Sequence, residues 1–421
     1  MVEASLQGVE TTEALAESSR WLTSLKDKAG GVMRKAMAAS GIVFASGALA
    51  PAAFANYQPY GGYIGGTDEH NLAVVLVNFE NSSDPPLNAE QTDQMMFTGP
   101  DSVSSYYSTA SFGKLDLHGE VVSSVELPDT LGPSCNGADF LKIGAAANAA
   151  IKKSSGTNLA GYDNYVYVLS QQADCINTNN QQVLNGQTIG NVSFINRPSN
   201  AQMEGVDVHE LGHQFGLSHA NVVHCYKPNG RQVQTPVNLS GDCTRVIYQD
   251  PFDPMGTARL STGAPIDFDA LNKARLGWLK PQNIKTVTRS ETITIAPDEL
   301  PSDEPQLVRI PYGHRGGEKR YLYIDYRQPL GEDAKVASTE KLATMFRGIT
   351  LREAGPIGRG QPITTLTDYS NLIDTNPETA TALDAPLGAS HMYHDAKTGI
   401  AVRTVELSPS SAKVSITIPS H

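Results

Sequence analysis

Residues 209–219 read His-Glu-Leu-Gly-His-Gln-Phe-Gly-Leu-Ser-His, and this stretch decides the fold and chemistry that we expect of the chain. In an α-helix, His209 and His213 lie one turn apart, so both imidazoles project from one face and can share one metal ion. Catalytic zinc sites use three protein ligands and keep a fourth position for water. The pattern therefore predicts His209, His213 and His219 as zinc ligands, with Glu210 as the base that takes a proton from that water.

Gly216 explains how the third histidine reaches the metal. A helix that continued past His213 would carry His219 too far along the axis to share the ion. Glycine adopts the left-handed conformation that ends helices, so we expect the chain to turn back at Gly216. The alternative is a chance pattern on an amphipathic helix, which residue frequencies put at about 10⁻⁵ to 10⁻⁴ occurrences per chain of this length. His224 falls outside the spacing and is interpreted as a solvated loop histidine.

A second segment, residues 248–256, reads Tyr-Gln-Asp-Pro-Phe-Asp-Pro-Met-Gly and has the chemistry of a tight turn around Met255. With the histidine motif, it resembles the metzincin group of zinc endopeptidases, in which a methionine turn lies beneath the metal. The resemblance implies that Met255 floors the site, and an ordinary surface turn is the alternative. Some metzincins add a tyrosine ligand two residues later, where this chain has Ala258. Tyr248 is a candidate oxyanion donor, although local packing also explains it.

Several segments resemble the gametolysin (peptidase M11) family and, more distantly, the immune-inhibitor-A type. They are residues 71–79, residues 105–114, the methionine turn and Leu276-Gly-Trp-Leu279. The likeness spans most of the chain after residue 55, but only the zinc and methionine segments are highly specific. Some members have glutamine in place of the first histidine, and the presence of His209 here favours zinc. The resemblance implies a zinc metalloendopeptidase that hydrolyses peptide bonds of extracellular or cell-wall proteins.

Residues 1–55 have the pattern of a secretory signal peptide. A polar segment ends in Arg34-Lys35, residues 36–50 are small and apolar, and Ala53-Phe54-Ala55 offers a small-x-small cleavage site. The polar segment is unusually long, so a misassigned start and an extended export signal both stay open. The apolar stretch is too short and too interrupted for a membrane anchor. We therefore expect cleavage near Ala55 and a secreted, extracellular or periplasmic protein.

The net charge of −12 lies entirely after residue 55, because acidic and basic residues cancel before it. An acidic surface disfavours nucleic acid and anionic membranes as partners, since both need clustered positive charge. The expected partner is a protein or peptide substrate, and the oligomeric state is not indicated. Calcium is a further candidate ion, although no stretch has a calcium-loop spacing.

The chain contains four cysteines, and an even number in an exported chain suggests two disulfides. Three pairings are possible, and nearness in sequence favours Cys225 with Cys243 and Cys135 with Cys175. Free buried thiols are the alternative. Because no cysteine precedes Cys135, a propeptide cysteine cannot occupy the fourth zinc position.

With 421 residues, 40% hydrophobic and 18% charged, the chain can support two cores. We predict a signal peptide at 1–55, an α/β (α+β) metzincin-like catalytic domain with a twisted sheet and a zinc-binding helix at 56–282, and a small all-β, sandwich-like domain at 283–421. The first domain should contain strands at 71–79, 115–124, 164–170 and 191–195 and a helix at 137–154. Its Asn/Gln-rich stretch 176–187 reads as a loop. The strand at 191–195 is either an edge strand that pairs with extended substrate or an internal strand.

The second domain should contain β-rich runs at 286–296, 306–311, 321–327, 348–352, 400–407 and 412–418. It either positions a wall or matrix substrate or completes the fold, and the second role is favoured because no basic or aromatic binding surface is recognisable. Two alternatives to an endopeptidase stay open. One is a zinc hydrolase that acts on bonds other than peptides, and the other is a secreted zinc-stabilised binding or adhesion protein, which would not need Glu210.

Overall fold

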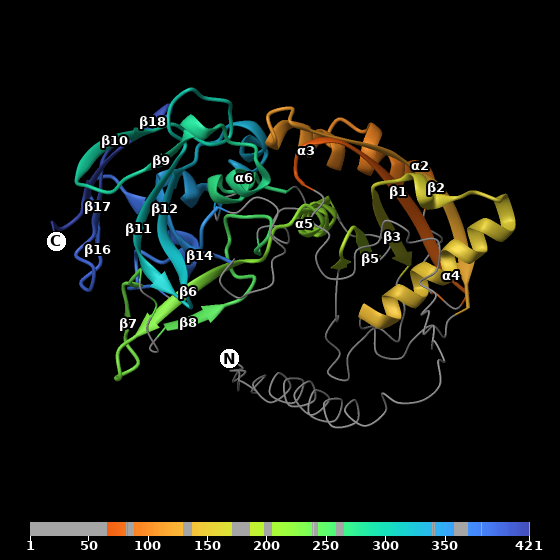
Figure 1. Cartoon of the computed structure of the whole chain (residues 1–421), viewed down its shortest axis with the longest axis horizontal. Coiled ribbons are helices and arrows are strands. Elements are labelled where there is room, and N and C mark those ends of the chain that lie inside the picture. The colour runs from red at the N-terminus through yellow and green to blue at the C-terminus, as the bar shows by residue number, and fades with distance from the viewer. Residues whose placement is uncertain are drawn as a thin grey trace, which may run out of the picture. The chain divides into compact units, whose positions relative to one another are not determined.

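The computed structural model of the chain describes residues 65–80, 82, 88–128, 137–170, 186–197, 204–237, 239, 243–257, 265–338, 340, 342–357, 369–379 and 381–420. The expected signal peptide, Cys135, Cys175 and Ala258 lie outside these residues. The chain from residue 51 onward clusters as one compact unit. The fold is mixed α/β, with several sheets and few helices among the described residues (Figure 1).

The first half of this unit is built on a five-stranded sheet with the order β2-β1-β3-β5-β4. Strands β1, β2, β3 and β5 run parallel, and only β4 is antiparallel to its neighbour β5. Their bounds are β1 Asp68–Phe79, β2 Leu115–Leu127, β3 Asn164–Ser170, β4 Gly186–Ile189 and β5 Val192–Arg197. The expected strands at 71–79, 115–124 and 164–170 are therefore present, and β3 has the expected bounds.

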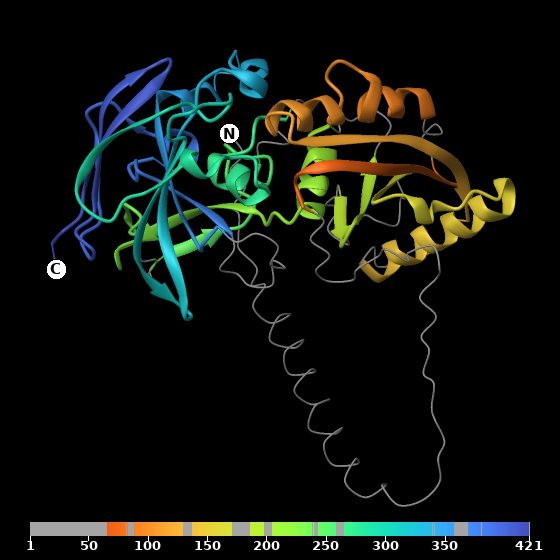
Figure 2. The same ribbon diagram turned by 45° about the horizontal axis from the view of Figure 1, so that its top comes forward.

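Helices cover both faces of this sheet, because the strand side chains alternate between two apolar clusters. One face packs against α4, which spans Gly137–Ser155, through residues such as Val75, Phe140 and Ile151. The other face packs against α3 (Val103–Ala110) and α5 (Glu204–Gln214) through residues such as Leu76 and Leu211. The short α2 (Ala89–Asp93) and the π-helical turn Gln94–Thr98 precede α3. Figures 1 and 2 show α5 between this sheet and the remaining strands.

The strand expected at 191–195 does not lie at the edge of the sheet, which was one of its two interpretations. That strand is β5, and it is internal, because it pairs with both β3 and β4. The edge strand is β4, which begins at Gly186 within a stretch that the sequence suggested was a loop. The sequence did not predict β4, because its residues show no alternation of apolar and polar side chains.

A second, larger sheet contains nine strands among the described residues. Its main order is β7-β6-β14-β13-β12-β11-β9, with β8 paired to β6 and β15 paired to β13. The bounds are β6 Ala220–Tyr226, β7 Gln232–Val233, β8 Cys243–Val246, β9 Ile284–Thr286, β11 Leu307–Arg315, β12 Glu318–Tyr326, β13 Gly348–Ala354, β14 Ser370–Ile373 and β15 Leu387–Gly388. Because β6 follows the histidine motif directly and pairs with β14, this sheet crosses the expected domain boundary at residue 283.

A four-stranded antiparallel sheet, with the order β10-β18-β17-β16, completes the chain. Its strands are β10 Glu291–Ile295, β16 Met392–His394, β17 Ala401–Ser408 and β18 Ser411–Thr417. The β-rich run expected at 286–296 is thus two strands in different sheets. One apolar cluster joins this sheet to the larger one, through residues such as Ile324, Leu351, Val402 and Val414.

The remaining helical segments lie between these strands. They are α6 (Ala270–Leu276) and the 3₁₀ turns Leu159–Gly161, Pro281–Asn283, Gly331–Val336, Leu342–Arg347 and Ala382–Asp384. Among the described residues, no helix combines the length and apolar character needed to cross a bilayer.

Candidate metal centre

Helix α5 is fixed to the five-stranded sheet by buried polar contacts as well as by its apolar face. Gln214 is fully buried at the end of the helix. Its Nε2 donates to Ser193 Oγ on β5 (2.6 Å), and its Oε1 accepts from Asn164 Nδ2 on β3 (2.6 Å). Because buried amides need partners, these contacts set the rotation of the helix against the sheet. That rotation fixes which way the histidines and Glu210 point.

The helix ends in the way that the sequence predicts. Gly216 has φ 97°, in the left-handed region that glycine adopts without steric cost. The backbone N–H of Gly216 donates to His213 O, and that of Leu217 donates to Gly212 O. These two bonds form a Schellman motif, which satisfies the last carbonyls of the helix and reverses the chain. The reversal delivers His219 to the face that carries His209 and His213.

The three histidines converge on one point. The Nε2 atom of His213 lies 3.1 Å from that of His209 and 3.0 Å from that of His219. Among the described residues, these three form the one group of three or more His, Cys, Asp or Glu side chains that could hold a metal ion. No such group supports the calcium ion that the sequence left open.

The tautomers of two of these histidines suit a cation between them. His209 Nδ1 lies 2.8 Å from Pro254 O, and His213 Nδ1 lies 2.7 Å from Leu217 O. Since a carbonyl only accepts, each Nδ1 carries the proton, and each Nε2 of a neutral ring presents a lone pair. Tetrahedral zinc with bonds of about 2.0–2.1 Å would separate such nitrogens by about 3.3 Å. The donor set and its backbone acceptors therefore fit zinc, which favours histidines held in this way.

Glu210 is buried beside the edge strand β4. Its Oε2 accepts a hydrogen bond of 2.6 Å from Thr188 Oγ1, which in turn lies 2.8 Å from Ser193 Oγ. Because both oxygens of Glu210 near Thr188, Oε2 and the backbone carbonyl at 2.9 Å, only accept, the Thr188 hydroxyl donates to Glu210 and the Ser193 hydroxyl then donates to Thr188. A Cβ on Gly186 would lie 2.6 Å from Glu210 Oε1, so only glycine lets β4 approach this closely. A role for Gly186 or Thr188 was not predicted from the sequence, because their proximity to Glu210 depends on how β4 packs in the fold.

Met255 packs directly against the helix that carries the histidines. It is fully buried, and a Cβ on Gly212 would lie 2.6 Å from its Sδ atom. Gly212, inside the histidine motif, is therefore needed for close packing rather than for its backbone freedom. The Met255 carbonyl accepts from Ala220 N (2.9 Å), which ties the turn to the residue after His219. The structure thus packs Met255 against the helix that carries His209 and His213, and its role as the floor of a metal site stays a prediction.

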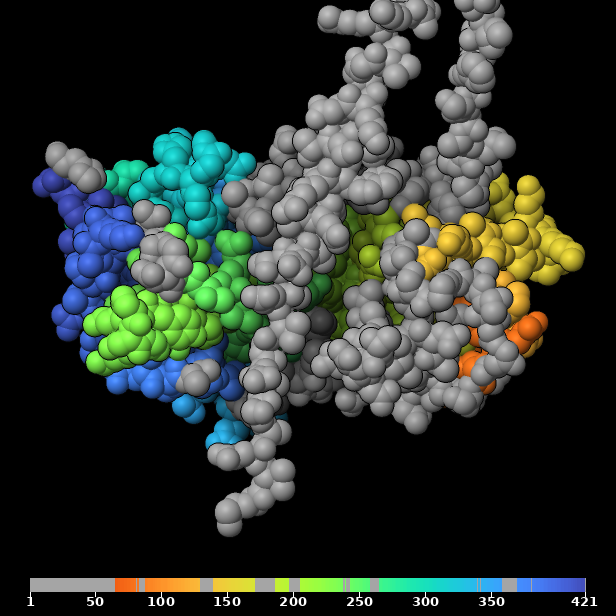
Figure 3. Space-filling model, turned by 90° about the horizontal axis from the view of Figure 1, so that it is seen from below, coloured from red at the N-terminus to blue at the C-terminus, as the bar shows by residue number. Residues whose placement is uncertain are grey.

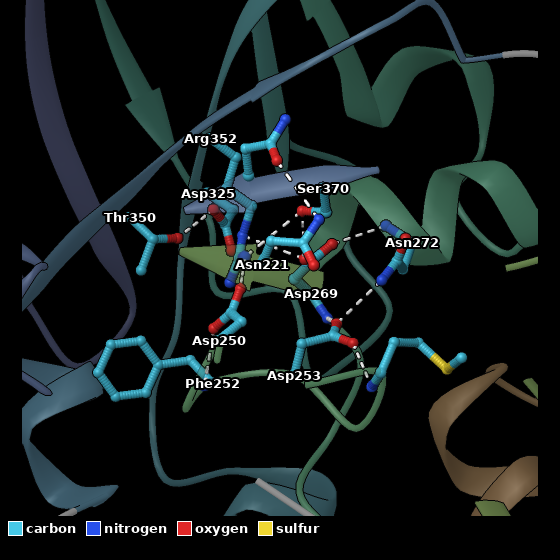
Figure 4. Close-up of polar contacts among 12 residues, drawn as sticks. Asn221, Asp250, Phe252, Asp253, Asp269, Asn272, Asp325, Thr350, Arg352 and Ser370 are labelled. Carbon is cyan, nitrogen blue, oxygen red and sulfur yellow. Dashed lines mark hydrogen bonds and ion pairs between the residues drawn. The ribbon is translucent and has the colours of Figure 1, made fainter. Parts of the chain in front are cut away.

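Buried aspartates hold the methionine turn in shape (Figure 4). Asp253 Oδ1 accepts from Met255 N (2.7 Å), and its Oδ2 accepts from Asp269 N (2.9 Å) and Asn272 Nδ2 (3.1 Å). Asp250 Oδ1 accepts from Phe252 N (2.8 Å). Burial raises the pKa of Asp253 well above its usual value, and the charge of Asp269 raises it further. The shape of the turn therefore depends on carboxyl groups that are buried away from solvent.

Two arginines from the C-terminal half reach this turn. Arg352 on β13 pairs with Asp250 through Nη1 and with Asp269 through Nε at 3.1 Å, and all three side chains are fully buried (Figure 4). Arg327, which follows β12, donates to Phe252 O and pairs with Asp333. The C-terminal half thus supplies one counter-charge and one hydrogen-bond donor to the methionine turn.

Tyr248 lies against the three-histidine cluster. Its ring centroid is 3.6 Å from that of His219 and 6.0 Å from that of His209. The residue has φ 65°, an uncommon conformation for a non-glycine residue, and its N–H donates to Asn221 Oδ1 (3.2 Å). Such backbone strain clusters at functional sites. The ring of Tyr248 therefore lies beside the histidine cluster.

The expected Cys225–Cys243 disulfide is present and joins β6 to β8 at paired positions. It closes the segment between the histidine motif and the methionine turn. The expected Cys135–Cys175 pair lies outside the described residues.

His224 is not the solvated loop histidine that the sequence suggested. It lies on β6 with only 15% of its side chain exposed, 3.0 Å from Gln232 Nε2 and 3.7 Å from Asp374 Oδ2. It also lines a pocket of ≈ 330 Å³ beside the methionine turn, formed by Val222, His224, Val246, Gln249, Pro251, Thr257, Leu342, Thr381, Ala382 and Leu383. This pocket lies on the β6 face opposite to Asn221, because side chains alternate along a strand.

Comparison with known proteins finds one family model that matches part of the chain. A sequence profile described as Gametolysin peptidase M11 matches residues 72–226, from β1 to the end of β6. The matched segment contains Glu210 and all three histidines. No curated protein matches the chain.

Proposed function

We propose, from the membership of residues 72–226 in the gametolysin peptidase M11 family, that this chain is a secreted zinc-dependent endopeptidase. The family supports a peptidase that acts on proteins. The zinc site, the base, the export and the extracellular or cell-wall substrates are our proposal, and so is a metzincin-like catalytic unit. The observation that carries it is the position of His213 Nε2, which lies within 3.1 Å of the Nε2 atoms of both other histidines and beside a buried glutamate.

In this proposal, His209, His213 and His219 hold the ion. Bound zinc supplies a Lewis acid that polarises the scissile carbonyl and lowers the pKa of water. Glu210 takes the proton of the attacking water and returns it to the leaving amide nitrogen. The Thr188 hydroxyl keeps the Glu210 carboxylate in place by its hydrogen bond. Tyr248, with its ring on His219, is the candidate donor to the developing oxyanion.

The edge strand β4 is the expected docking site for substrate. Its outer edge pairs with no other strand among the described residues, and its Gly186 touches Glu210. An extended peptide that adds to this edge would run past the general base. The glutamate next to the docking edge also argues against a protein that only binds zinc for stability.

The substitution Glu210→Gln tests the proposal. It keeps the shape and removes the base, so we expect hydrolysis of a denatured protein to fall by about 10²–10⁴-fold with one zinc still bound. Glu318→Gln, at an exposed position on β12, is the matched control and should retain full activity. If the Glu210→Gln protein hydrolyses the substrate at the normal rate, the mechanism is wrong. If the unaltered protein binds zinc but cleaves nothing, the binding or adhesion alternative replaces it.

A further inference from the structure

Arg245 is a half-buried cation close to the metal centre. It lies on β8, and its guanidinium carbon is 5.7 Å from the centroid of the Tyr369 ring. The Tyr369 ring lies nearly parallel to that of His219, with a centroid separation of 6.3 Å. A single aromatic ring therefore links a proposed zinc ligand to Arg245.

The strand register places Arg245 on the sheet face that looks toward the metal centre. Arg245 pairs with Val223 on β6, and paired residues project from the same face. Asn221, two residues earlier, shares that face, and its Oδ1 accepts from the backbone N–H of Tyr248. The ring centroids of Tyr248 and Tyr369 lie 3.6 Å and 6.3 Å from that of His219. In Figure 3, the surfaces of β6–β8 and of β4–β5 both appear on one face of the molecule.

Arg245 lies near two other arginines that share one carboxylate. Arg315 and Arg320 both pair with the buried Glu353, at 3.4 Å and 2.5 Å. The charges of Arg315, Arg320 and Glu353 all act on Arg245. Burial lowers the pKa of Arg245, and the neighbouring Arg315 lowers it further. An arginine in such surroundings gains by binding an anion.

The orientation of the guanidinium favours a carboxylate. Arg245 Nε donates to Asn371 Oδ1 (2.8 Å), which holds the plane of the group. The edge with both Nη atoms remains, and a carboxylate binds this edge with two parallel hydrogen bonds. Among the residues that the structure describes, no carboxylate lies within ion-pair distance of Arg245.

We propose that Arg245 forms a subsite for a substrate carboxylate beside the metal centre. The proposal rests on the proposed peptidase function, because the ligand is part of the substrate. The carboxylate belongs either to an Asp or Glu side chain near the scissile bond or to the C-terminus of a short peptide. The plainer role, a strut between β8 and β14 through Asn371, would not distinguish charged from neutral substrates.

The test uses quenched fluorescent peptides of one sequence, with Glu or Gln placed in turn at each position around the scissile bond. We expect kcat/KM for the best Glu peptide to exceed that for its Gln counterpart by about tenfold to a hundredfold, as for a hydrogen bond to a charged group. Arg245→Gln should remove this preference and leave the Gln peptide within about twofold of its former rate, because glutamine keeps an N–H donor for Asn371 and the neutral peptide has no carboxylate to lose. Arg245→Lys should restore part of it, because lysine keeps the charge but not the fork.

Two controls make the result specific. Arg403→Gln, at an exposed position on β17, should leave the preference unchanged. Matched peptides with a free or an amidated C-terminus separate the two sources of carboxylate. Equal rates for Glu and Gln at every position, together with equal rates for acid and amide, overturn the proposal. An equal fall in kcat/KM for both peptides in Arg245→Gln also overturns it, because a purely structural role of Arg245 predicts that result.

A binding measurement separates this proposal from the proposed function. The Glu210→Gln protein is titrated calorimetrically with the Glu and Gln peptides, with and without Arg245→Gln. Tighter binding of the Glu peptide that depends on Arg245 supports the subsite even if no peptide is cleaved. Equal binding, or no binding, of the two peptides contradicts it even if cleavage is normal.

Discussion

The buried ion pair between Arg352 and the methionine turn predicts that replacing this arginine will strongly lower the free energy of unfolding. In the substitution Arg352→Met, Asp250 and Asp269 both lose their fully buried cation. Breaking a buried ion pair on one side costs about 3–5 kcal/mol, because a desolvated charge is left without compensation. The free energy of unfolding should therefore fall by about this amount, measured by urea unfolding and circular dichroism. Arg403→Met at an exposed position is the matched control, with an expected change within about 0.5 kcal/mol.

The origin of this loss can be isolated by a double-mutant cycle. Asp250→Asn removes one of the stranded charges, so the double variant should be less destabilised than the sum of the two single variants by more than about 1 kcal/mol. The zinc affinity should fall as well, by about 10–100-fold, because the turn carries the Pro254 carbonyl that orients His209. Additive effects, or an Arg352→Met protein as stable as the control, would refute the reasoning that a C-terminal arginine holds the methionine turn.

Two further predictions concern Glu210 and the buried acids. Thr188→Val removes the donor to the Glu210 carboxylate and should lower kcat by about tenfold to a hundredfold with normal zinc content, while Thr188→Ser stays active; equal kcat in all three proteins would contradict the positioning role. Burial raises the pKa of Asp267 and of Asp325 from 3.8 to about 6, so the folded protein binds more protons than the unfolded chain in this range. Stability should then fall as the pH rises from 4 through 6, and this fall should be smaller in Asp325→Asn, which urea unfolding at pH 5 and 7.5 measures; an identical pH dependence in both proteins would argue against it.

Local patterns predicted the elements that form the centre. The parallel strands β1 and β3 are buried on both faces and appear in the sequence as unbroken apolar runs, which is why their positions follow from composition. The helix that carries His209 and His213 and its end at Gly216 follow from spacing and from the conformational freedom of glycine. These features depend on residues that are neighbours along the chain.

Contacts between residues that are distant in the sequence could not be predicted from these local patterns. Arg352 and Asp250 are 102 positions apart, and nothing in either neighbourhood marks them as partners. The edge strand β4 is short and polar, and its importance comes from Gly186 touching Glu210 rather than from its own pattern. The boundary expected at residue 283 reflects a change in composition, but β6 pairs with β14 across it. Pairing between strands is decided by tertiary packing, which one sequence does not display.

Titration of metal-free protein with zinc tests the central claim most directly. Hydrolysis of a peptide substrate is measured as zinc is added to protein from which a chelator has removed all metal. We predict no hydrolysis without metal and a linear rise that ends at one zinc ion per chain, because His209, His213 and His219 form a single site. Hydrolysis by the metal-free protein at the full rate would contradict the account.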